Sequence, residues 1–236
     1  MSTVSQFLEA ARQKTADSHE RTAVRKAIAT YDAKVADGKA RFADWQNARA
    51  IAAGKKWDAI NHLDRYLEQF ERNVTANGGQ VHWAEDSAQA RQIILDLARQ
   101  RGVKKVVKSK SMVTEEIHLN EALGVAGIHA IETDLGEYII QQAGEPPSHI
   151  IGPALHKSKS QVAELFREKH DLGERDLGDV PQMVREARRV LRERFLAADA
   201  GITGANALVV ENGSIMLVTN EGNGDLCSIL PRLHIV

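Results

Sequence analysis

The sequence predicts an α/β protein, with a mostly parallel sheet flanked by helices and an N-terminal helical arm. Two observations support this fold class. From Gln80 onward, short β-branched segments alternate with longer amphipathic ones, which is the pattern of parallel strands joined by helices. Before Gln80 the chain is rich in Ala, Lys, Arg, Glu and Gln and has no proline, which favours helices.

The arm, residues 1–76, carries apolar stripes at helical spacing. Gly38 and Gly54 are the expected breaks between its helices, and the sequence NGG at residues 77–79 should end the last one. We expect the arm to pack on the main domain or on another subunit. The stripes recur every three or four residues, at Phe42, Trp45, Ala48 and Ala52, and at Trp57, Ile60, Leu63, Leu67, Phe70 and Val74.

The main domain, residues 77–236, should alternate strands and helices. Strands are expected at residues 80–85, 103–110, 129–134 and 148–154, and helices at 86–102, 114–123, 135–144, 158–170 and 181–200. A strand, a tight ENGS turn, a second strand, a glycine-rich loop and a last strand should complete it, within residues 201–236. The chain stops at Val236 within an apolar run, which suggests a boundary inside a longer protein.

Composition excludes several classes of function. A net charge of -1 gives no overall field for nucleic acid or an acidic membrane surface. No apolar run reaches the roughly 18 residues of a membrane span, and the N-terminus lacks a signal peptide, so we expect a cytoplasmic protein. Cys227 is the only cysteine, so this chain alone completes neither a disulfide nor a cysteine-based metal site.

Ligands of an open α/β sheet bind beyond the carboxyl ends of the strands, where helices begin. Four segments should meet there: "KSKSMVTEE", "ETDLGEY", "GPALHKSKS" and "TNEGNGD". The first offers ammonium groups and hydroxyls that suit a carboxylate or phosphate, from Lys108, Ser109, Lys110, Ser111 and Thr114. Alternatively, Ser111 or Thr114 is only a helix cap and the lysines are solvated surface.

Two glycine-rich segments, "GITGAN" and then "TNEGNGD", would let the backbone approach a ligand closely. Each could instead be a hairpin tip. Neither segment has the spacing of a phosphate-binding or dinucleotide-binding loop, which argues against a simple nucleotide enzyme. The residues concerned are Thr203 and Gly204 in the first segment, and Thr219, Asn220, Glu221, Gly222 and Asn223 in the second.

Carboxylates and one histidine complete the candidate site. Glu132 and Asp134, two residues apart at a strand end, could face the same side, while Glu211 and Glu221 are candidates for a catalytic base or nucleophile. His156 is placed near the expected site, and it could also be a simple helix-entry residue. The nine histidines show no metal-binding spacing, so no metal site is expected.

Five segments in order give the chain a family resemblance. The segments "VVKSKSMVTEEIHLNEAL", "ETDLGEYIIQ", "PSHIIGPALHKSKSQVAELF", "ADAGITGANALVVENGSIMLVTNEGN" and "LPRLHIV" resemble the LUD (lactate utilization) domain of iron-sulfur proteins. The resemblance implies a core like that of the NagB/RpiA/CoA-transferase group and a role in a multi-subunit complex that oxidises L-lactate to pyruvate. It places [4Fe-4S] clusters in a C-terminal region that this chain lacks, so no cofactor is expected here.

The resemblance leaves three functions open. The domain could bind a small carboxylate or phosphate or dock other lactate-utilization subunits, without catalysis of its own. It could be a CoA- or acyl-transferase-like enzyme, with Glu211 of "VVENGS" as the nucleophile. It could also be a non-catalytic scaffold for the cluster-bearing region.

Overall fold

The computed structural model describes residues 3–145, 147 and 152–236. Contacts divide the chain into two units, residues 1–62 with 147–158, and residues 63–146 with 159–236. Our division of the chain between residues 76 and 77 stays a prediction. In the described part of the chain, no helix combines the length and the apolar character that crossing a membrane requires.

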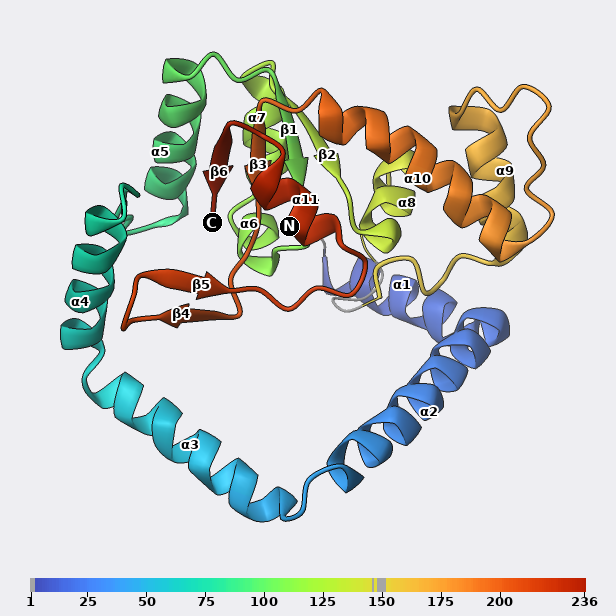
Figure 1. The fold of residues 1–236 in the computed structure, drawn as a ribbon. Coiled ribbons are helices and arrows are strands. Elements are labelled where there is room, and N and C mark those ends of the chain that lie inside the picture. Colours follow the sequence, from blue (N-terminus) through green and yellow to red (C-terminus); the bar gives the residue numbers. More distant parts are fainter. Residues whose placement is uncertain (1–2, 146, 148–151) are drawn as a thin grey trace. The chain divides into compact units, whose positions relative to one another are not determined.

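The first unit contains the helices α1 (Val4–Ala16), α2 (Ser18–Ala40) and α3 (Trp45–Asn61) (Figure 1). Gly38 and Gly54 lie inside α2 and α3, so both expected breaks were wrong. A helical glycine costs only about 1 kcal/mol, which the surrounding turns tolerate. The break before α3 instead lies at Asp44, whose side chain accepts a hydrogen bond from the backbone N–H of Asn47.

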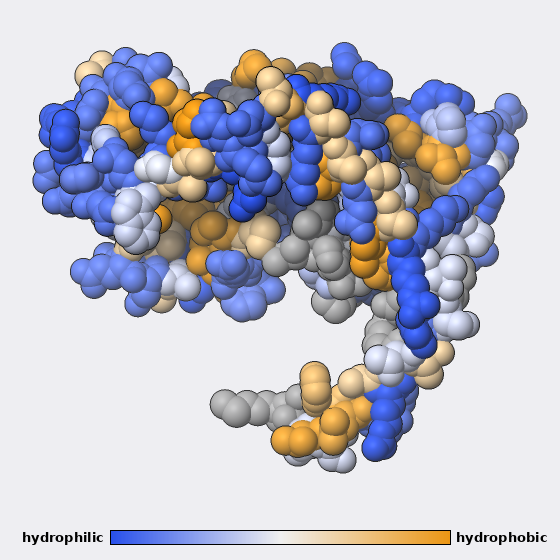
Figure 2. Space-filling model, turned by 90° about the horizontal axis from the view of Figure 1, so that it is seen from below, coloured by the Kyte–Doolittle hydropathy of each residue, from blue (hydrophilic) through white to orange (hydrophobic). Residues whose placement is uncertain are grey.

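Large apolar side chains of the first unit remain at its surface. The exposed fractions are 64% for Phe7, 68% for Trp57 and 65% for Ile60. Figure 2 shows hydrophobic residues, in orange, at the surface among hydrophilic residues, in blue. Such exposed apolar area suits packing against a further surface, and the identity of that surface stays a prediction.

The second unit contains a four-stranded parallel sheet, as predicted. Its strands are β1 (Lys105–Lys108), β2 (His129–Glu132), β3 (Ala200–Ile202) and β6 (Leu233–Ile235), in the spatial order β2-β1-β3-β6. The predicted α/β class with an N-terminal helical region is thereby confirmed. The antiparallel hairpin of β4 (Ala207–Val209) and β5 (Ser214–Met216) stands apart from this sheet.

Helices cover both faces of the parallel sheet (Figure 1). Val106, Ala200 and Ile202 share a core with α5 and α7, whereas Gly201 faces Cys227 of α11, as side-chain alternation along a strand requires. The helices of this unit are α4 (Leu63–Ala76), α5 (Ser87–Gln100), α6 (Met112–Glu116), α7 (Leu119–Val125), α8 (Leu135–Ala143), α9 (Lys159–Lys169), α10 (Val180–Leu196) and α11 (Asn223–Ile229).

Two expected strands are not found as predicted. Residues 80–85 form no strand, because they are largely exposed and no described strand pairs with them. Of the strand expected at 148–154, residues 148–151 lie outside the described part, and residues 153–154 form a turn.

Two other predicted elements are divided. The helix expected at 114–123 splits into α6 and α7, because His118 adopts a left-handed backbone conformation with φ 52°. The strand expected at 201–210 splits into β3 and β4, which belong to different sheets. The expected glycine-rich loop also leads directly into α11, which the sequence did not predict.

Replacement of Gly201 by alanine should destabilise the fold. An added Cβ would lie 1.8 Å from the backbone oxygen of Cys227, so β3 and α11 would have to move apart. Overpacking of this kind costs about 1–3 kcal/mol or more, measurable as a lower free energy of unfolding in urea. Gly124→Ala is the control, because nothing lies within 4 Å of its added Cβ, and it should leave stability unchanged or higher. Equal stability of the two variants would contradict the packing of α11 on β3.

Candidate functional site

The carboxyl ends of β1, β2 and β3 lie at the same level of the sheet. Lys108 is in register with Glu132 of β2 and with Ile202 of β3. The backbone N–H of Thr133 donates to the Lys108 carbonyl at 2.9 Å, and that of Ser109 donates to the Ile202 carbonyl at 2.9 Å. The loops after these strands therefore start side by side. We call these strand ends and the side chains around them the strand-end cluster, which consists of residues 108–111, Glu115, Asn120, residues 132–134, Glu137, residues 203–204 and residues 221–223.

A buried ion pair joins the ends of β1 and β2. Because Lys108 and Glu132 are in register, their side chains point to the same face, where Asn120 of α7 lies. The Lys108 ammonium donates to Glu132 at 2.5 Å and to the Asn120 side-chain oxygen at 2.8 Å. The Asn120 amide donates to the same Glu132 oxygen at 2.7 Å. The Lys108 side chain is only 1% exposed, so its charge serves this contact rather than a surface ligand.

Lys110 lies beside a buried carboxyl of α8. Its ammonium is 3.8 Å from Oε1 of Glu137, whose side chain is 6% exposed against 27% for Lys110. Burial raises the pKa of Glu137 to about 9, with further contributions from Glu132 and from a hydrogen bond to Glu115, while Lys110 opposes the rise. At neutral pH Glu137 is therefore a neutral carboxylic acid that can donate a hydrogen bond.

Two further acidic residues, Asp134 and Glu221, lie where α8 begins. Asp134 caps α8 by accepting hydrogen bonds from the backbone N–H groups of Gly136 and Glu137. Glu221 accepts from the Leu135 N–H at 3.3 Å. Partial burial raises the pKa of Glu221, the charge of Asp134 adds to this, and Lys110 opposes it. Lys110 thus acts on carboxyls of both α8 and the loop before α11.

The opposite face of the same strand ends carries uncharged polar groups. The Thr133 hydroxyl donates to the Lys108 carbonyl at 2.6 Å and lies 3.6 Å from the Cys227 sulfur. Asn223 donates to the Thr133 hydroxyl at 3.4 Å. Burial raises the pKa of Cys227 to about 11, so this thiol stays protonated and is a poor nucleophile.

Three buried polar atoms of the strand-end cluster have no hydrogen-bond donor or acceptor among the described groups. They are Ser109 Oγ, Glu132 Oε2 and Glu137 Oε2. A buried polar atom without a partner costs about 1–3 kcal/mol. A small ligand that brings its own donors and acceptors would recover this free energy, so the cluster has the character of a binding site.

Thr203 and Gly204 directly follow β3, and Thr219, Asn220 and Gly222 lie in the loop before α11. Thr203 contacts the His234 ring at 2.9 Å, and burial lowers the pKa of that histidine. A Cβ on Gly204 would lie 3.4 Å from the Ser111 hydroxyl oxygen. In the loop, the Gly222 N–H donates to the Thr219 hydroxyl at 3.3 Å, and Asn220 is exposed.

The helix-cap alternative holds in part for the first loop. Ser111 is the first residue before α6 but makes no side-chain cap bond. Thr114 donates to the Ser111 carbonyl at 2.8 Å, which ties the loop to the helix. These two residues therefore shape the loop that carries Lys110.

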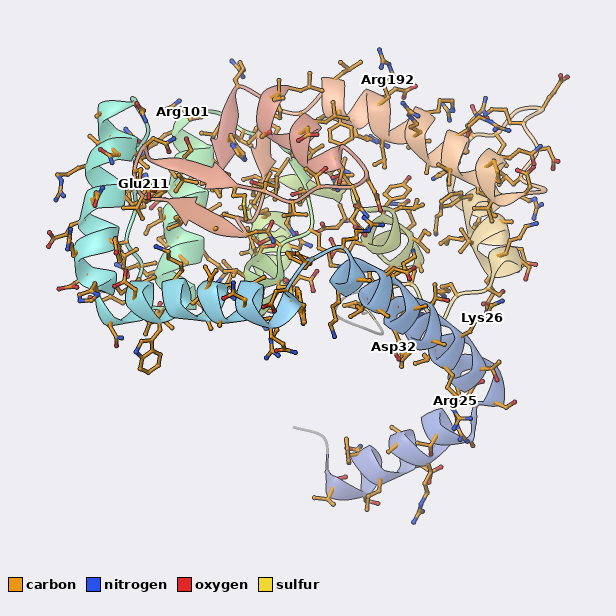
Figure 3. The ribbon with its side chains drawn as sticks, turned by 60° about the horizontal axis from the view of Figure 1, so that its bottom comes forward. Arg25, Lys26, Asp32, Arg101, Arg192 and Glu211 are labelled. Atoms are coloured by element: carbon orange, nitrogen blue, oxygen red, sulfur yellow. The ribbon has the colours of Figure 1, made fainter. Side chains whose placement is uncertain are left out.

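Glu211 is not part of the strand-end cluster. Glu211 is exposed on the turn between β4 and β5 (Figure 3). Asn73 and Asn77, from α4 and the turn that follows it, hold this turn through hydrogen bonds to the carbonyls of Val210 and Asn212, at 2.8 and 2.7 Å. His156 belongs to the first unit.

A separate cavity of about 840 Å³ opens along the outer edge of β2. Gln141 of α8 covers part of this edge, since its amide bonds to the Glu132 N–H and the Ala130 carbonyl at 3.1 and 3.0 Å. Further in, Tyr138 and His170 contact each other at 2.8 Å. Asn120 lines the cavity, which therefore reaches the amide that bonds to both members of the buried ion pair.

The sequence did not indicate three side chains of the cluster: Glu137, Glu115, which contributes to its raised pKa, and Asn120. Glu137 could have been predicted, because it lies three residues after Asp134, about one helical turn further, and directly before the apolar run that begins at Tyr138. Asn120 could not, because its direction depends on the left-handed His118 that separates α6 from α7.

Comparisons with known proteins identify the domain type. Residues 67–236 match the family model described as the LUD domain. "Lactate utilization protein B" of Bacillus velezensis is 47% identical over 193 residues, covering 81% of this chain and 40% of the relative. The protein of the same name from Geobacillus kaustophilus is 47% identical over 192 residues, with the same coverage.

Longer alignments give the same result. "Lactate utilization protein B" of Bacillus cereus is 43% identical over 222 residues, which is 93% of this chain and 46% of the relative. The chain thus spans less than half the length of the curated relatives it matches. No solved structure shows significant similarity to the chain.

Replacing one member of the buried ion pair should lower the free energy of unfolding more than replacing both members. Lys108→Met leaves the Glu132 carboxylate buried without its cation, which should lower the free energy of unfolding by about 3–5 kcal/mol. The double variant Lys108→Met/Glu132→Met should recover most of this loss. Asp96→Ala, which removes the exposed pair with Arg99, should cost under about 1 kcal/mol in the same urea titration. A loss for Lys108→Met as small as that of Asp96→Ala would contradict a buried pair.

The raised pKa of Glu137 predicts a stability that falls with rising pH. Between the ordinary value of 4.5 and about 9, the folded chain holds a proton on Glu137 that the unfolded chain releases. The free energy of unfolding of the wild type should therefore decrease, relative to Glu137→Gln, as pH rises through this window. Urea titrations across the window measure the difference between the two proteins. A constant difference would show that Glu137 titrates normally.

Proposed function

Because the chain belongs to the LUD domain family, we propose that it is the LUD-domain portion of an iron-sulfur subunit of a complex that oxidises L-lactate to pyruvate. In this proposal the strand-end cluster binds a small carboxylate, namely lactate or pyruvate. The observation that carries it is the position of Lys110 beside buried polar atoms that lack partners.

The charges of the cluster favour a small ion with a single negative charge. Of its two lysines, Lys108 is already neutralised by Glu132, so the positive charge near the surface comes from Lys110. Asp134 and Glu221 lie together at the start of α8, and Lys110 acts on Glu221, so a doubly charged phosphate would meet these acidic groups. A monocarboxylate can accept from the Lys110 ammonium and from the buried Ser109 hydroxyl.

The relatives support lactate as the metabolite. Their printed name is "Lactate utilization protein B", and they are 43% to 47% identical to this chain. Lactate and pyruvate are both small carboxylates with one negative charge, so the charge argument and the name point to the same class of ligand.

The residues of this chain do not fit a [4Fe-4S] cluster, which takes four cysteine thiolates. Cys227 is fully buried and its thiol lies against Thr133. Within residues 3–145, 147 and 152–236, no three His, Cys, Asp or Glu side chains are grouped to hold a metal. We therefore place the clusters in further sequence of the protein, since the relatives are more than twice as long as the region they share with this chain.

Partner subunits and location follow from the same proposal. Oxidation of lactate to pyruvate releases two electrons, so other lactate-utilization subunits must pass them on. With no membrane-crossing helix in the described part of the chain, the proposed setting is the cytoplasm. Growth tests the pathway: a strain without the full-length gene should fail on L-lactate and grow normally on pyruvate.

Lys110→Ala should weaken binding of L-lactate and pyruvate. A lost charge-assisted hydrogen bond is worth about 1.5–3 kcal/mol, which is roughly a ten- to hundred-fold increase in Kd. Isothermal titration calorimetry on the purified chain measures this change. Lys104→Ala is the matched control, because Lys104 is exposed at the opposite end of the strand, and it should bind as the wild type does. Unchanged affinity in Lys110→Ala would refute the strand-end site.

A further inference from the structure

The cavity along the outer edge of β2 has basic side chains along one wall. Its volume of about 840 Å³ is typical of a site for a small molecule. The residues that line it come mainly from β2, α8, α10 and the end of α9, all within the second unit (Figure 1). Of the strand-end cluster, only Asn120 lines it, so the cavity is a separate place for a ligand.

One buried carboxylate fixes two arginines of this wall. The Glu186 side chain is 2% exposed, and it accepts from Nε of Arg175 at 2.8 Å and from Nη2 of Arg189 at 2.9 Å. Both guanidinium groups also donate to the backbone carbonyl of Asp171. A guanidinium group has five N–H donors in one plane, so each arginine is held in place and still has a donor for a ligand.

A third arginine extends the wall along α10. Arg194 lines the cavity and forms no ion pair with the acidic side chains that the structure describes. It lies five residues after Arg189, which is about 7.5 Å further along the helix axis. The long side chains at these two positions can therefore contact the same ligand.

Negative charges of the wall only partly balance these arginines. The hydrogen bond from Arg189 lowers the pKa of Glu186, so this carboxylate is ionised and balances one positive charge. Glu193, 3.5 Å from Arg189, and Asp171 also line the cavity, and both are exposed to water. Lys169 adds a further cation to the lining. The wall therefore has more positive than negative charges.

The floor of the cavity is polar and uncharged. Tyr138 and His170 are both buried and contact each other at 2.8 Å. Burial lowers the pKa of His170 and raises that of Tyr138 to about 12, so neither is charged at neutral pH. Nδ1 of His170 lies 3.5 Å from Oε1 of Glu186. The same buried carboxylate therefore contacts both the floor and the arginine wall, which gives the site a fixed frame.

The side of the cavity along β2 suits the organic part of a ligand. Ile128, Ile131 and Val190 line it with apolar side chains, and Gln142 adds an amide. An anion such as phosphate would fill only part of the volume. A ligand that fills the cavity therefore combines a charged group with a larger, less polar part.

We propose that this cavity binds a small organic phosphate, whose phosphate group is held by Arg175, Arg189 and Arg194. Guanidinium groups match phosphate oxygens with two parallel hydrogen bonds, which makes arginine the preferred residue for this group. The proposal goes beyond lactate oxidation, because it assigns a second ligand to a site that does not involve Lys110.

Titration of the purified chain with inorganic phosphate, followed by phosphorus NMR at constant ionic strength, tests the arginine wall. Arg194→Ala should raise the Kd about ten-fold or more, as expected for the loss of charge-assisted hydrogen bonds. Arg192→Ala is the matched control, because Arg192 is exposed on α10 (Figure 3) and does not line the cavity. Equal effects of the two variants would overturn the site.

Two further measurements test the geometry and the organic part. Arg189→Lys keeps the charge next to Glu186 but loses the planar pair of donors, so it should also weaken phosphate binding. Unchanged urea unfolding of Arg194→Ala would confirm that its effect is not a loss of folding. Phenyl phosphate should bind the wild type more tightly than inorganic phosphate, because its ring contacts the apolar side of the cavity. Equal affinities would overturn the organic part of the proposal.

Lys110→Ala distinguishes this site from the one proposed for lactate. It should leave phosphate binding unchanged. If Lys110→Ala weakens phosphate binding and Arg194→Ala does not, phosphate binds at the strand-end cluster and the cavity site is wrong. If phosphate does not bind the wild type at all, this inference fails and the lactate site is unaffected.

Discussion

The candidate site depends on one buried contact, the ion pair of Lys108 and Glu132 with Asn120 as a shared partner. A buried ammonium is stable only if its charge is compensated and its N–H groups are bonded. The strand register places the two charges opposite each other, and α7 supplies the amide. This contact joins the ends of β1 and β2, where the loops of the proposed binding site begin. It also leaves Lys110, rather than Lys108, as the lysine that a ligand can reach.

The ion pair also affects the protonation of a neighbouring carboxyl group. Glu132 contributes to the raised pKa of Glu137, although burial is the larger cause, so a neutral acid stands next to Lys110 at physiological pH. Glu115 supplies a carboxylate at the surface of the same group. In the proposed site, an ammonium next to a neutral acid suits a singly charged carboxylate better than a doubly charged phosphate. Lactate, which the names of the relatives mention, is such an ion.

The sequence predicted the fold better than the chemistry of the site. Alternating strand and helix patterns depend on local periodicity, so the parallel sheet and helices α5, α8, α9 and α10 could be predicted. The segment 80–85 has the same local character but lacks a strand to pair with, which local patterns do not reveal. Lys108 and Lys110 read alike in the sequence, but β1 ends at Lys108, so Lys108 lies in the sheet opposite Glu132 whereas Lys110 lies in the loop that follows. The bond from Asn120 to Glu132 depends on the left-handed His118 that separates α6 from α7, so no spacing in the sequence indicates it.

The position of a bound ligand tests the central claim most directly. A crystal structure of the chain with L-lactate should show the lactate carboxylate at the Lys110 ammonium, beyond the ends of β1 and β2, with Lys108 still bonded to Glu132. Lactate in the cavity along the outer edge of β2, or a Lys108 side chain turned from Glu132 to the ligand, would contradict the account.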